Sequence, residues 1–569
     1  MLESLAHGWG SLLFGYAAVQ VPMLVGLARA RQPWYAYLAS PVVAAPLAAL
    51  VGAGSALAGS LFTGLGAAHG LAQFTLATSL SALLGYSGGR RWAEASPRDS
   101  LYLRGALVEE SSGKYPQPAG RSSAITLAGR PVAARDEAKH FKLIGTTGTG
   151  KSTAIREILG TALARGDRAV IADPDAGYLD RFFEPARGDV ILNPFDERSV
   201  KWDLFAEIKS SYDVEQLARS LIPDHEGSDR SWRAYARTFF GAVTHQAHEA
   251  GITDTGELYR LLVVADTAEL RTLLRGTPAQ PFVDEHNSRM FDSIRSVTTS
   301  AVDSFEYVAR QKGPLFSIRA WVGEERPGVL FMPYKAGQIA ALRSTISAWM
   351  RLAIFEAMDA PAEPADSSGE DARRLWFVVD ELDALGQIDG LKDALARLRK
   401  FGGRCVLGFQ SVAQVSSTYG AGAAHTIIEN CGNSLILRCS ASEGGGTARF
   451  ASQLIGEREV IRTSVSRSRR SNEVLGSVSR SEHVSIEQAV LPSQIEQLPD
   501  LAGYLKRASD PQWQRVQFQA RAAWNGRRTA YAGAASPVAA ASREAALLSR
   551  DATASRDGAV VSPDGREYG

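Results

Sequence analysis

Eight residues near position 150 carry the first chemical signal in the chain. Residues 145–152 read Gly-Thr-Thr-Gly-Thr-Gly-Lys-Ser, a complete G-x-x-x-x-G-K-[ST] pattern. Glycines let the backbone turn tightly enough to aim N–H groups at phosphate oxygens, and a helix N-terminus adds partial positive charge. In this pattern the lysine, Lys151, reaches the β- and γ-phosphates and the serine, Ser152, binds Mg²⁺. The sequence therefore predicts a site for ATP and Mg²⁺. Its nucleotide-contacting residues are expected to be Gly145, Thr146, Thr147, Gly148, Thr149, Gly150, Lys151, Ser152 and Thr153.

The segments on either side of this loop suit a phosphate-binding loop. Residues 140–144 are strand-like and residues 153–159 are helix-like. A glycine-rich turn that only joins a strand to a helix is the alternative. The complete set of glycines, lysine and serine favours the binding loop.

A second chemical signal is the acidic pair Asp380-Glu381, which ends the apolar run Trp376–Val379. This is the Walker B pattern. Asp380 is expected to hold Mg²⁺ together with Ser152, and Glu381 to polarise the attacking water. Acidic residues that end a strand also serve as helix N-caps, which is the alternative interpretation.

Two further candidates follow along the chain. Gln410 ends the apolar run 405–409, where it would contact both water and the γ-phosphate as a sensor; a capping glutamine is the alternative. Between the acidic pair and this run lie Arg397, Arg399 and Lys400. One of these cations would act as an arginine finger for a neighbouring subunit, or all three form a solvated basic face. Position alone leaves that choice open.

The elements around these motifs alternate between strand-like and helix-like segments. Short apolar runs at 168–173 and 189–193, separated by segments of helix length, predict a parallel, doubly wound α/β sheet. Residues 206–322 have helical periodicity and read as an all-α insertion. We therefore expect an NTPase domain at 121–205 and 323–523, and a disordered Ala/Ser/Arg-rich tail at 524–569.

The N-terminal region differs in kind from the rest. From Tyr35 to Gly89 there is no Lys, Arg, Asp or Glu. One helix of that length would measure about 80 Å, against a hydrocarbon core of about 30 Å, so the pattern predicts two membrane spans near 37–59 and 66–86. Residues 11–28 are either a third span or an interfacial helix. Arginine pairs flank the hairpin, which places both pairs and the following connector at 91–120 in the cytoplasm.

Composition narrows the class of protein. A net charge of +1 over 569 residues excludes a strongly basic protein, so contacts to nucleic acid would come from local patches. The three cysteines, Cys405, Cys431 and Cys439, have no metal-ligand spacing. We expect them to be small buried side chains in a reducing compartment.

Several of these motifs together resemble the TraD/TrwB-type coupling proteins of conjugative type IV secretion. The resemblance covers about residues 121–520. Besides the P-loop and the acidic pair, it is carried by residues 192–198, 202–204, 316–321, 399–403, 408–411 and 498–501.

The resemblance implies a RecA-like motor with an inserted all-α domain, anchored in the bacterial inner membrane as a multi-pass protein. It implies a homo-hexamer that pumps single-stranded DNA using ATP, with relaxase or relaxosome proteins and the secretion channel as partners. It also places the arginine finger on Arg399. The expected catalytic set is then Lys151, Asp380, Glu381, Gln410 and Arg399, with Ser152 and Asp380 as Mg²⁺ ligands.

Two other functions remain as alternatives. An FtsK-like translocase of double-stranded DNA shares the membrane anchor and the RecA-like chemistry, but the short C-terminal tail has no space for its winged-helix module. A receptor that docks cargo without hydrolysing ATP would not need Lys151, Asp380 and Glu381 together. Measurement of ATP turnover with and without DNA separates these functions.

Overall fold

The computed structural model describes most of the chain outside the loops and the C-terminal region. The described residues are 2–29, 34–61, 75, 77–88, 100–110, 124–224, 229–324, 326–359, 373–442, 445–468 and 477–519. They form two compact units, residues 1–103 with 459–485, and residues 104–458 with 486–569. The predicted tail at 524–569 lies outside the described residues.

The N-terminal part of the first unit, up to residue 88, is helical where the structure describes it. Helix α1 spans Leu2–Arg29, α2 spans Trp34–Leu61, and residues 77–88 form a further helix. The Gln20 amide donates a 2.6 Å hydrogen bond from α1 to the Ser40 hydroxyl on α2. A side chain at Gly26 or Gly85 would collide with the backbone of the facing helix, so these glycines permit α1 and residues 77–88 to pack closely.

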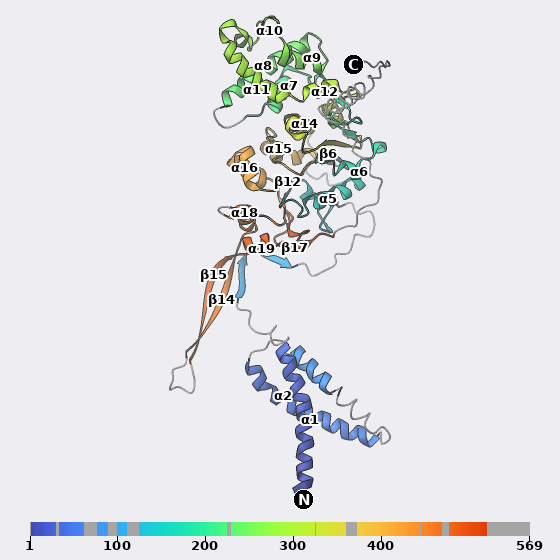
Figure 1. Cartoon of the computed structure of the whole chain (residues 1–569), viewed down its shortest axis with the longest axis vertical. Coiled ribbons are helices and arrows are strands. Elements are labelled where there is room, and N and C mark those ends of the chain that lie inside the picture. The colour runs from blue at the N-terminus through green and yellow to red at the C-terminus, as the bar shows by residue number, and fades with distance from the viewer. Residues whose placement is uncertain are drawn as a thin grey trace, which may run out of the picture. The chain divides into compact units, whose positions relative to one another are not determined.

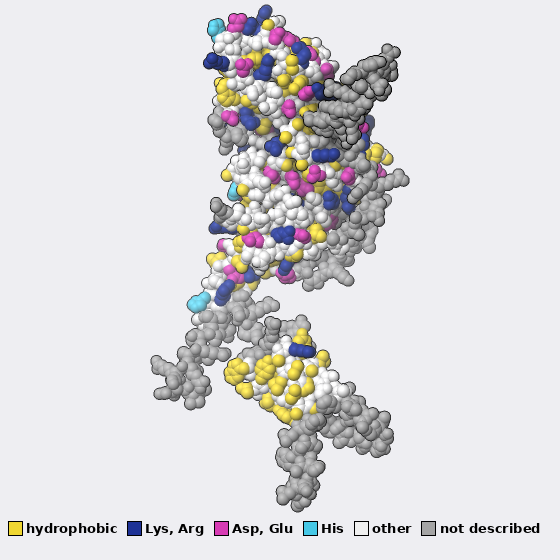
Figure 2. All heavy atoms as spheres, viewed as in Figure 1, with side chains coloured by type: hydrophobic (Ala, Val, Ile, Leu, Met, Phe, Trp, Pro, Cys, Tyr) yellow, Lys and Arg dark blue, Asp and Glu magenta, His cyan; other side chains and the backbone are white. Residues whose placement is uncertain are grey.

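Apolar side chains cover much of the described surface of this unit, as the yellow patch in Figure 2 shows. Exposed examples are Val21 and Val25 on α1 and Leu38, Val42 and Val43 on α2. Even so, among the residues that the structure describes, no helix combines the length and the apolarity needed to cross a membrane. The predicted spans are therefore not confirmed. The segment that joins the two predicted spans, residues 62–65, and one of the flanking arginine pairs, Arg90 and Arg91, lie outside the described residues.

The second unit is built on a sheet of ten strands (Figure 1). Its strand order is β2 (Val108–Glu110), β17 (Trp513–Gln517), β16 (Ala502–Lys506), β13 (Asn433–Ile436), β5 (Phe141–Ile144), β12 (Gly403–Phe409), β11 (Leu375–Val379), β6 (Arg168–Pro174), β10 (Val329–Tyr334) and β7 (Val190–Ile191). The seven strands from β13 to β7 are parallel, whereas β16 pairs antiparallel with β13 and with β17. The sheet is mixed, which corrects the prediction of a wholly parallel one.

Both faces of the parallel part are buried, because successive side chains along a strand point to opposite faces. On β11, Trp376 and Val378 join a core with α5 (Lys151–Arg165), while Phe377 and Val379 join a second core with α14 (Ile339–Asp359) and α15 (Leu391–Leu398). Helices therefore cover both faces (Figure 1). The near-continuous apolar runs in these strands are the sequence signature of that burial.

Further helices extend the second core. Between β8 (Lys201–Trp202) and β10 the chain forms α7 (Ser211–Leu221), α8 (Arg230–Glu249), α9 (Thr255–Tyr259), α10 (Thr267–Leu273), α11 (Ser288–Val302), α12 (Phe305–Arg310) and α13 (Ile318–Gly323). The buried Glu207 carboxylate accepts backbone N–H bonds from Ile318 and Arg319, which fixes the start of α13. Trp202 packs edge-on against Trp349 of α14, so these helices share a core with the sheet.

Two segments differ from their predicted structure. The connector at 91–120 contains β1 (Ser100–Gly105) and β2, and β2 extends the main sheet beside β17. A solvated loop is expected from sequence for the Ser/Arg-rich stretch 464–470, whereas residues 464–468 lie in β14 (Glu457–Ser468), which forms a three-stranded sheet with β1 and β15 (Ser477–Gln488).

His140 stands just before β5 and uses both ring nitrogens. The Cys405 N–H donates to its Nδ1 at 3.0 Å, so the Nε2–H donates to the Leu395 carbonyl at 2.9 Å. This arrangement requires the neutral ring. Burial, and less strongly the positive charges of Arg404 and Arg399, lower the pKa of His140 to about 4.

We predict a pH-dependent loss of stability from this residue. The unfolded chain takes up a proton at His140 below the ordinary histidine pKa, whereas the folded chain does so only near pH 4. The contribution of His140 to the free energy of unfolding is therefore fully present above about pH 6.5. It is lost as the pH drops toward 4, which lowers the free energy of unfolding by about 3 kcal/mol. Chemical denaturation at several pH values measures the free energy of unfolding, and the difference between wild type and His140→Gln gives the pH-dependent contribution of His140. The exposed His425→Gln variant should keep the wild-type pH profile; a wild-type profile in His140→Gln would contradict the assignment.

Candidate nucleotide-binding site

The candidate catalytic groups meet at the carboxyl edge of three adjacent strands. In the order β5–β12–β11, the P-loop follows β5, Gln410 follows β12, and Asp380-Glu381 follow β11. Phe409 is in register with Ile144, and Val379 with Leu407. Neighbouring strands lie about 4.8 Å apart, so all three groups fall within reach of one nucleotide.

The P-loop has the backbone that its glycines permit. Gly148 and Gly150 have φ values of 80° and 118°, in the left-handed region that other residues rarely adopt, and α5 begins at Lys151. A Cβ at Gly150 would also lie 2.9 Å from the Leu501 side chain. Leu501 in turn donates its N–H to the Thr149 carbonyl at 2.9 Å. Leu501 therefore holds the C-terminal end of the loop.

Lys151 lies against its own loop. Its ammonium donates to the Gly145 carbonyl at 2.6 Å and to the Thr146 carbonyl at 3.3 Å. Burial lowers the pKa of Lys151, and the charges of Asp380 and Glu381 oppose that shift. The Lys151 ammonium therefore lies between the loop carbonyls and two carboxylates. When a nucleotide binds, its phosphate oxygens would replace the carbonyl oxygens as the partners of this ammonium.

Ser152 and Asp380 are in direct contact. The serine hydroxyl donates to Oδ2 of the carboxylate at 2.7 Å, while Oδ1 is buried and has no hydrogen-bond partner within the described part of the chain. No group of three or more His, Cys, Asp or Glu side chains among the described residues could hold a metal. Mg²⁺ does not need such a cluster, because it binds through one or two carboxylates and completes its coordination shell with phosphates and water. A hydroxyl beside a carboxylate with one oxygen free fits this cation.

Glu381 and Gln410 form a bridge to the P-loop. The Gln410 amide donates to Glu381 Oε1 at 3.1 Å, and its carbonyl oxygen accepts from the Thr147 hydroxyl at 3.0 Å. Burial, and then the charge of Asp380, raise the pKa of Glu381. A carboxylate with a raised pKa is a stronger base toward water. Gln410 thus contacts both the P-loop, at Thr147, and the candidate base Glu381, as a sensor residue would.

Arg399 lies at the other edge of the sheet. It begins the short helical turn Arg399–Phe401, which leads directly into the start of β12 at Gly403, and its side chain is exposed. Gln410 follows the far end of that seven-residue strand. At about 3.3 Å per residue, roughly 20 Å separate Arg399 from the nucleotide site of its own chain. Arg399 is therefore outside the site that the other four candidates form.

Arg438 also lies near the nucleotide site, beside the P-loop of its own chain. Its guanidinium pairs with Asp500 at 2.6 Å, and its carbonyl accepts the Thr146 N–H at 2.9 Å. These contacts support the loop of the same chain.

The sequence motifs do not identify every residue that shapes the site. Tyr178 donates its hydroxyl to Asp380 Oδ2 at 2.7 Å, and Asp173 accepts the N–H groups of Tyr178 and Leu179. Burial raises the pKa of Asp173 to about 7. An acid that ends the apolar run 168–173 was the available signal for Asp173. Tyr178 has no such local signature.

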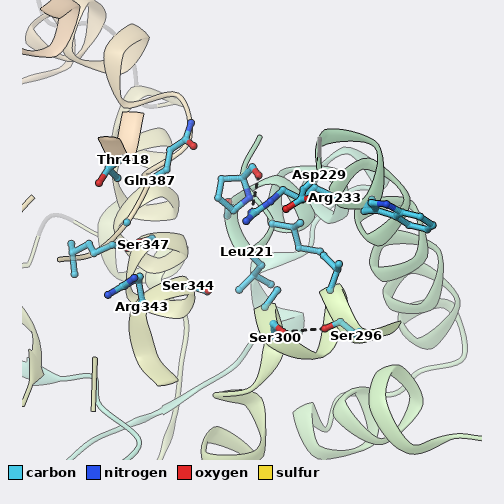
Figure 3. Close-up of a pocket in the computed structure, with 18 of the residues that line it drawn as sticks. Leu221, Asp229, Arg233, Ser296, Ser300, Arg343, Ser344, Ser347, Gln387 and Thr418 are labelled. Carbon is cyan, nitrogen blue, oxygen red and sulfur yellow. Dashed lines mark hydrogen bonds between the residues drawn. The ribbon is translucent and has the colours of Figure 1, made fainter. Parts of the chain in front are cut away.

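Size does not single out the site among the cavities. The P-loop pocket holds about 270 Å³ and is lined by Lys151, Ser152, Arg156, Asp380 and Glu381, among others. A cavity of about 980 Å³ lies between α8, α11 and α14 (Figure 3). Its labelled lining includes Arg233, Arg343 and several serines, and its wall continues into Asp383 and Gly386, just after the acidic pair. It lacks the glycine-rich backbone that binds phosphate.

This sheet, with its P-loop and acidic pair, defines a P-loop NTPase of the RecA-like class. The family model for the type IV secretion-system coupling protein DNA-binding domain matches residues 124–519. The chain belongs to this family of coupling proteins, which confirms the predicted resemblance.

Individual relatives agree with the family. The coupling protein TraD of Escherichia coli K12 is 32% identical over 393 residues, which are 68% of this chain and 53% of TraD. The chain thus spans about half the length of that relative. Conjugal transfer protein TraG of Escherichia coli is 23% identical over 420 residues, covering 65% of this chain and 64% of TraG.

Solved structures of TrwB share the fold. The unbound form of this bacterial conjugative coupling protein, solved as TrwBdeltaN70, matches with a TM-score of 0.65 at 31% identity, covering 74% of this chain and 93% of the solved chain. TrwB in complex with ADP and Mg²⁺ matches with a TM-score of 0.65 at 30% identity, covering 75% and 96%.

The geometry predicts that Glu381→Gln separates nucleotide binding from hydrolysis. The substitution keeps the size of the side chain and leaves Ser152 and Asp380 in place, but removes the base. We expect the affinity for ATP to stay close to that of the wild type and the rate of ATP turnover to fall by about 100-fold or more. Nucleotide affinity by fluorescence and phosphate release measure the two effects. Asp383→Asn, in the same loop but lining the larger cavity, is the matched control and should retain turnover; equal loss in both variants would contradict the role of Glu381.

Proposed function

We propose that this protein is a coupling ATPase that moves single-stranded DNA toward a type IV secretion channel, driven by Mg²⁺-dependent ATP hydrolysis. One observation carries the proposal: the hydroxyl of Ser152 contacts Asp380, while Gln410 joins Glu381 to Thr147 of the same P-loop. Each group needed for phosphoryl transfer, except a cation from a neighbour, therefore lies at one edge of the sheet.

The roles of the residues follow from their positions. Backbone N–H groups of the P-loop and the Lys151 ammonium hold the phosphates, and Ser152 with Asp380 holds the cation. Mg²⁺ neutralises the charge that spreads over the phosphate oxygens. Glu381 orients and accepts a proton from the attacking water, and Gln410 fixes Glu381 relative to the loop. Arg399 would act as the arginine finger for the nucleotide site of a neighbouring subunit.

Membership of the coupling-protein family supports the proposed partners. TraD and TrwB are named as coupling proteins, and the matching domain as DNA-binding. We therefore infer single-stranded DNA, relaxase or relaxosome proteins and the secretion channel as partners. The apolar surface of the N-terminal helices supports attachment to the bacterial inner membrane.

ATP turnover by the purified full-length chain tests the function. We expect Mg²⁺-dependent hydrolysis that single-stranded DNA stimulates, and its loss in Lys151→Ala because the phosphates lose their main cation. Stimulation only by double-stranded DNA would instead favour an FtsK-like translocase. Nucleotide binding without turnover in the wild type would favour a cargo receptor.

Arg399 is predicted to act in trans within a ring of six subunits. Its distance from the nucleotide site of its own chain supports a role in trans, and a planar guanidinium suits the developing phosphate charge. Arg399→Ala should bind ATP normally but hydrolyse it about 10³-fold more slowly. Particle imaging measures ring size, and phosphate release measures turnover.

Mixing variants identifies the subunit that supplies the arginine. A mixture of Arg399→Ala with Lys151→Ala should recover part of the activity, because some interfaces then pair an intact P-loop with an intact finger. Arg397→Ala, two residues away and also exposed, is the matched control and should hydrolyse ATP like the wild type. Mixed rings without recovery would contradict the trans assignment.

A further inference from the structure

Asp380 receives a second hydroxyl that the P-loop NTPase motifs do not include. Tyr178 donates to Asp380 Oδ2 at 2.7 Å, on the same oxygen that accepts from Ser152. Two donors on one oxygen fix the rotation of the carboxylate and leave Oδ1 available to a cation. Charge-assisted hydrogen bonds of this length are among the stronger contacts in proteins.

The tyrosine is delivered by a turn that the protein holds firmly. Asp173 at the end of β6 lies one position beyond Ala172, whose partner on β11 is Val379, so Asp173 and Asp380 are neighbours across the sheet. The Asp173 carboxylate accepts the N–H groups of Tyr178 at 3.0 Å and of Leu179 at 2.7 Å. One carboxylate thus positions the residue that orients the next.

Backbone conformation in this turn points to the same constraint. Asp175 and Ala176 have φ values of 56° and 58°, which are unfavourable for residues other than glycine. Such conformations persist where the surrounding contacts determine them, and they are concentrated at functional sites. Here the turn places the Tyr178 ring in the core beside α5 and its hydroxyl on Asp380.

The environment keeps the Tyr178 hydroxyl a donor. Tyr178 is 1% exposed, and burial together with the charge of Asp380 raises its pKa well above the ordinary value. The guanidinium of Arg156, which lines the nucleotide pocket, lies 5.8 Å from the centre of its ring.

We propose that Tyr178 is a positioning residue that holds Asp380 in the orientation required for binding of Mg²⁺ with the nucleotide. The proposal rests on the proposed function, because it concerns the same site. It differs from a core-packing role, which the aromatic ring alone would fulfil.

Tyr178→Phe removes the hydroxyl and keeps the ring. The direct measurement is ADP affinity with excess Mg²⁺ and with EDTA, on the full-length protein. We expect wild-type affinity in EDTA, and an affinity about tenfold weaker than wild type in Mg²⁺, since a hydrogen bond to a charged group is lost. The Mg²⁺ concentration for half-maximal ATP turnover should rise by a similar factor.

Tyr334→Phe is the matched control. Tyr334 is also buried near these acids, which raise its pKa after the larger effect of burial, but its hydroxyl has no hydrogen-bond partner in the described ranges. Its removal should leave the Mg²⁺ response unchanged. The same shift in both variants would overturn the proposal, because it would then reflect any buried hydroxyl near the site.

The remaining outcomes also discriminate. Equal weakening in EDTA and in Mg²⁺ for Tyr178→Phe would assign a structural role to the hydroxyl and overturn the proposal. A wild-type Mg²⁺ response in that variant would do the same. If wild type itself binds nucleotide without any effect of Mg²⁺, the proposed ATPase function fails, and that result is distinct from either of the others.

Discussion

The close approach of β12 to β11 at the carboxyl edge of the sheet is the constraint on which the site depends. Leu382 donates its N–H to the Gly408 carbonyl at 3.0 Å, and a Cβ at Gly408 would collide with the Asp380 carbonyl oxygen. Only glycine permits this approach. Because β12 lies between β5 and β11, the separation of the P-loop from Asp380 is set by two strand spacings. A bulkier residue at Gly408 would displace Asp380 from Ser152 and Gln410 from Glu381 together.

The polar contacts at this edge form one connected network. Asp173 fixes Tyr178, Tyr178 and Ser152 orient Asp380, and Gln410 joins Glu381 to Thr147. Networks of this kind are valuable only when their members are satisfied, since an unpaired buried polar group costs about 1–3 kcal/mol. The free Oδ1 of Asp380 is therefore informative, because binding of a cation would satisfy it. Elsewhere Arg165, Glu137 and Asp167 form a buried ion-pair cluster away from the nucleotide pocket, and there no charge needs a ligand.

The proposed function assigns the two edges of the sheet to different chains. The carboxyl edge carries the candidate nucleotide site, whereas Arg399 is exposed at the amino edge near His140, whose pKa it helps to lower. A strand of seven residues is rigid and keeps these groups about 20 Å apart. This separation suits a ring in which each nucleotide lies at a subunit boundary.

Local signals in the sequence determined the P-loop, the acidic pair, most of the strands and the family, because each lies within one strand-turn-helix unit of contiguous residues. Burial on both faces gives the strands of the parallel sheet their apolar runs, so the α/β class was predictable from them. The antiparallel β16 and the strand at 464–468 were not, because their pairing depends on distant partners. Only the tertiary structure decided that Gln410 contacts Glu381, that Arg399 is remote from its own site, and that Tyr178 reaches Asp380, 202 residues away. These contacts follow from strand order and register, which no short segment of sequence contains.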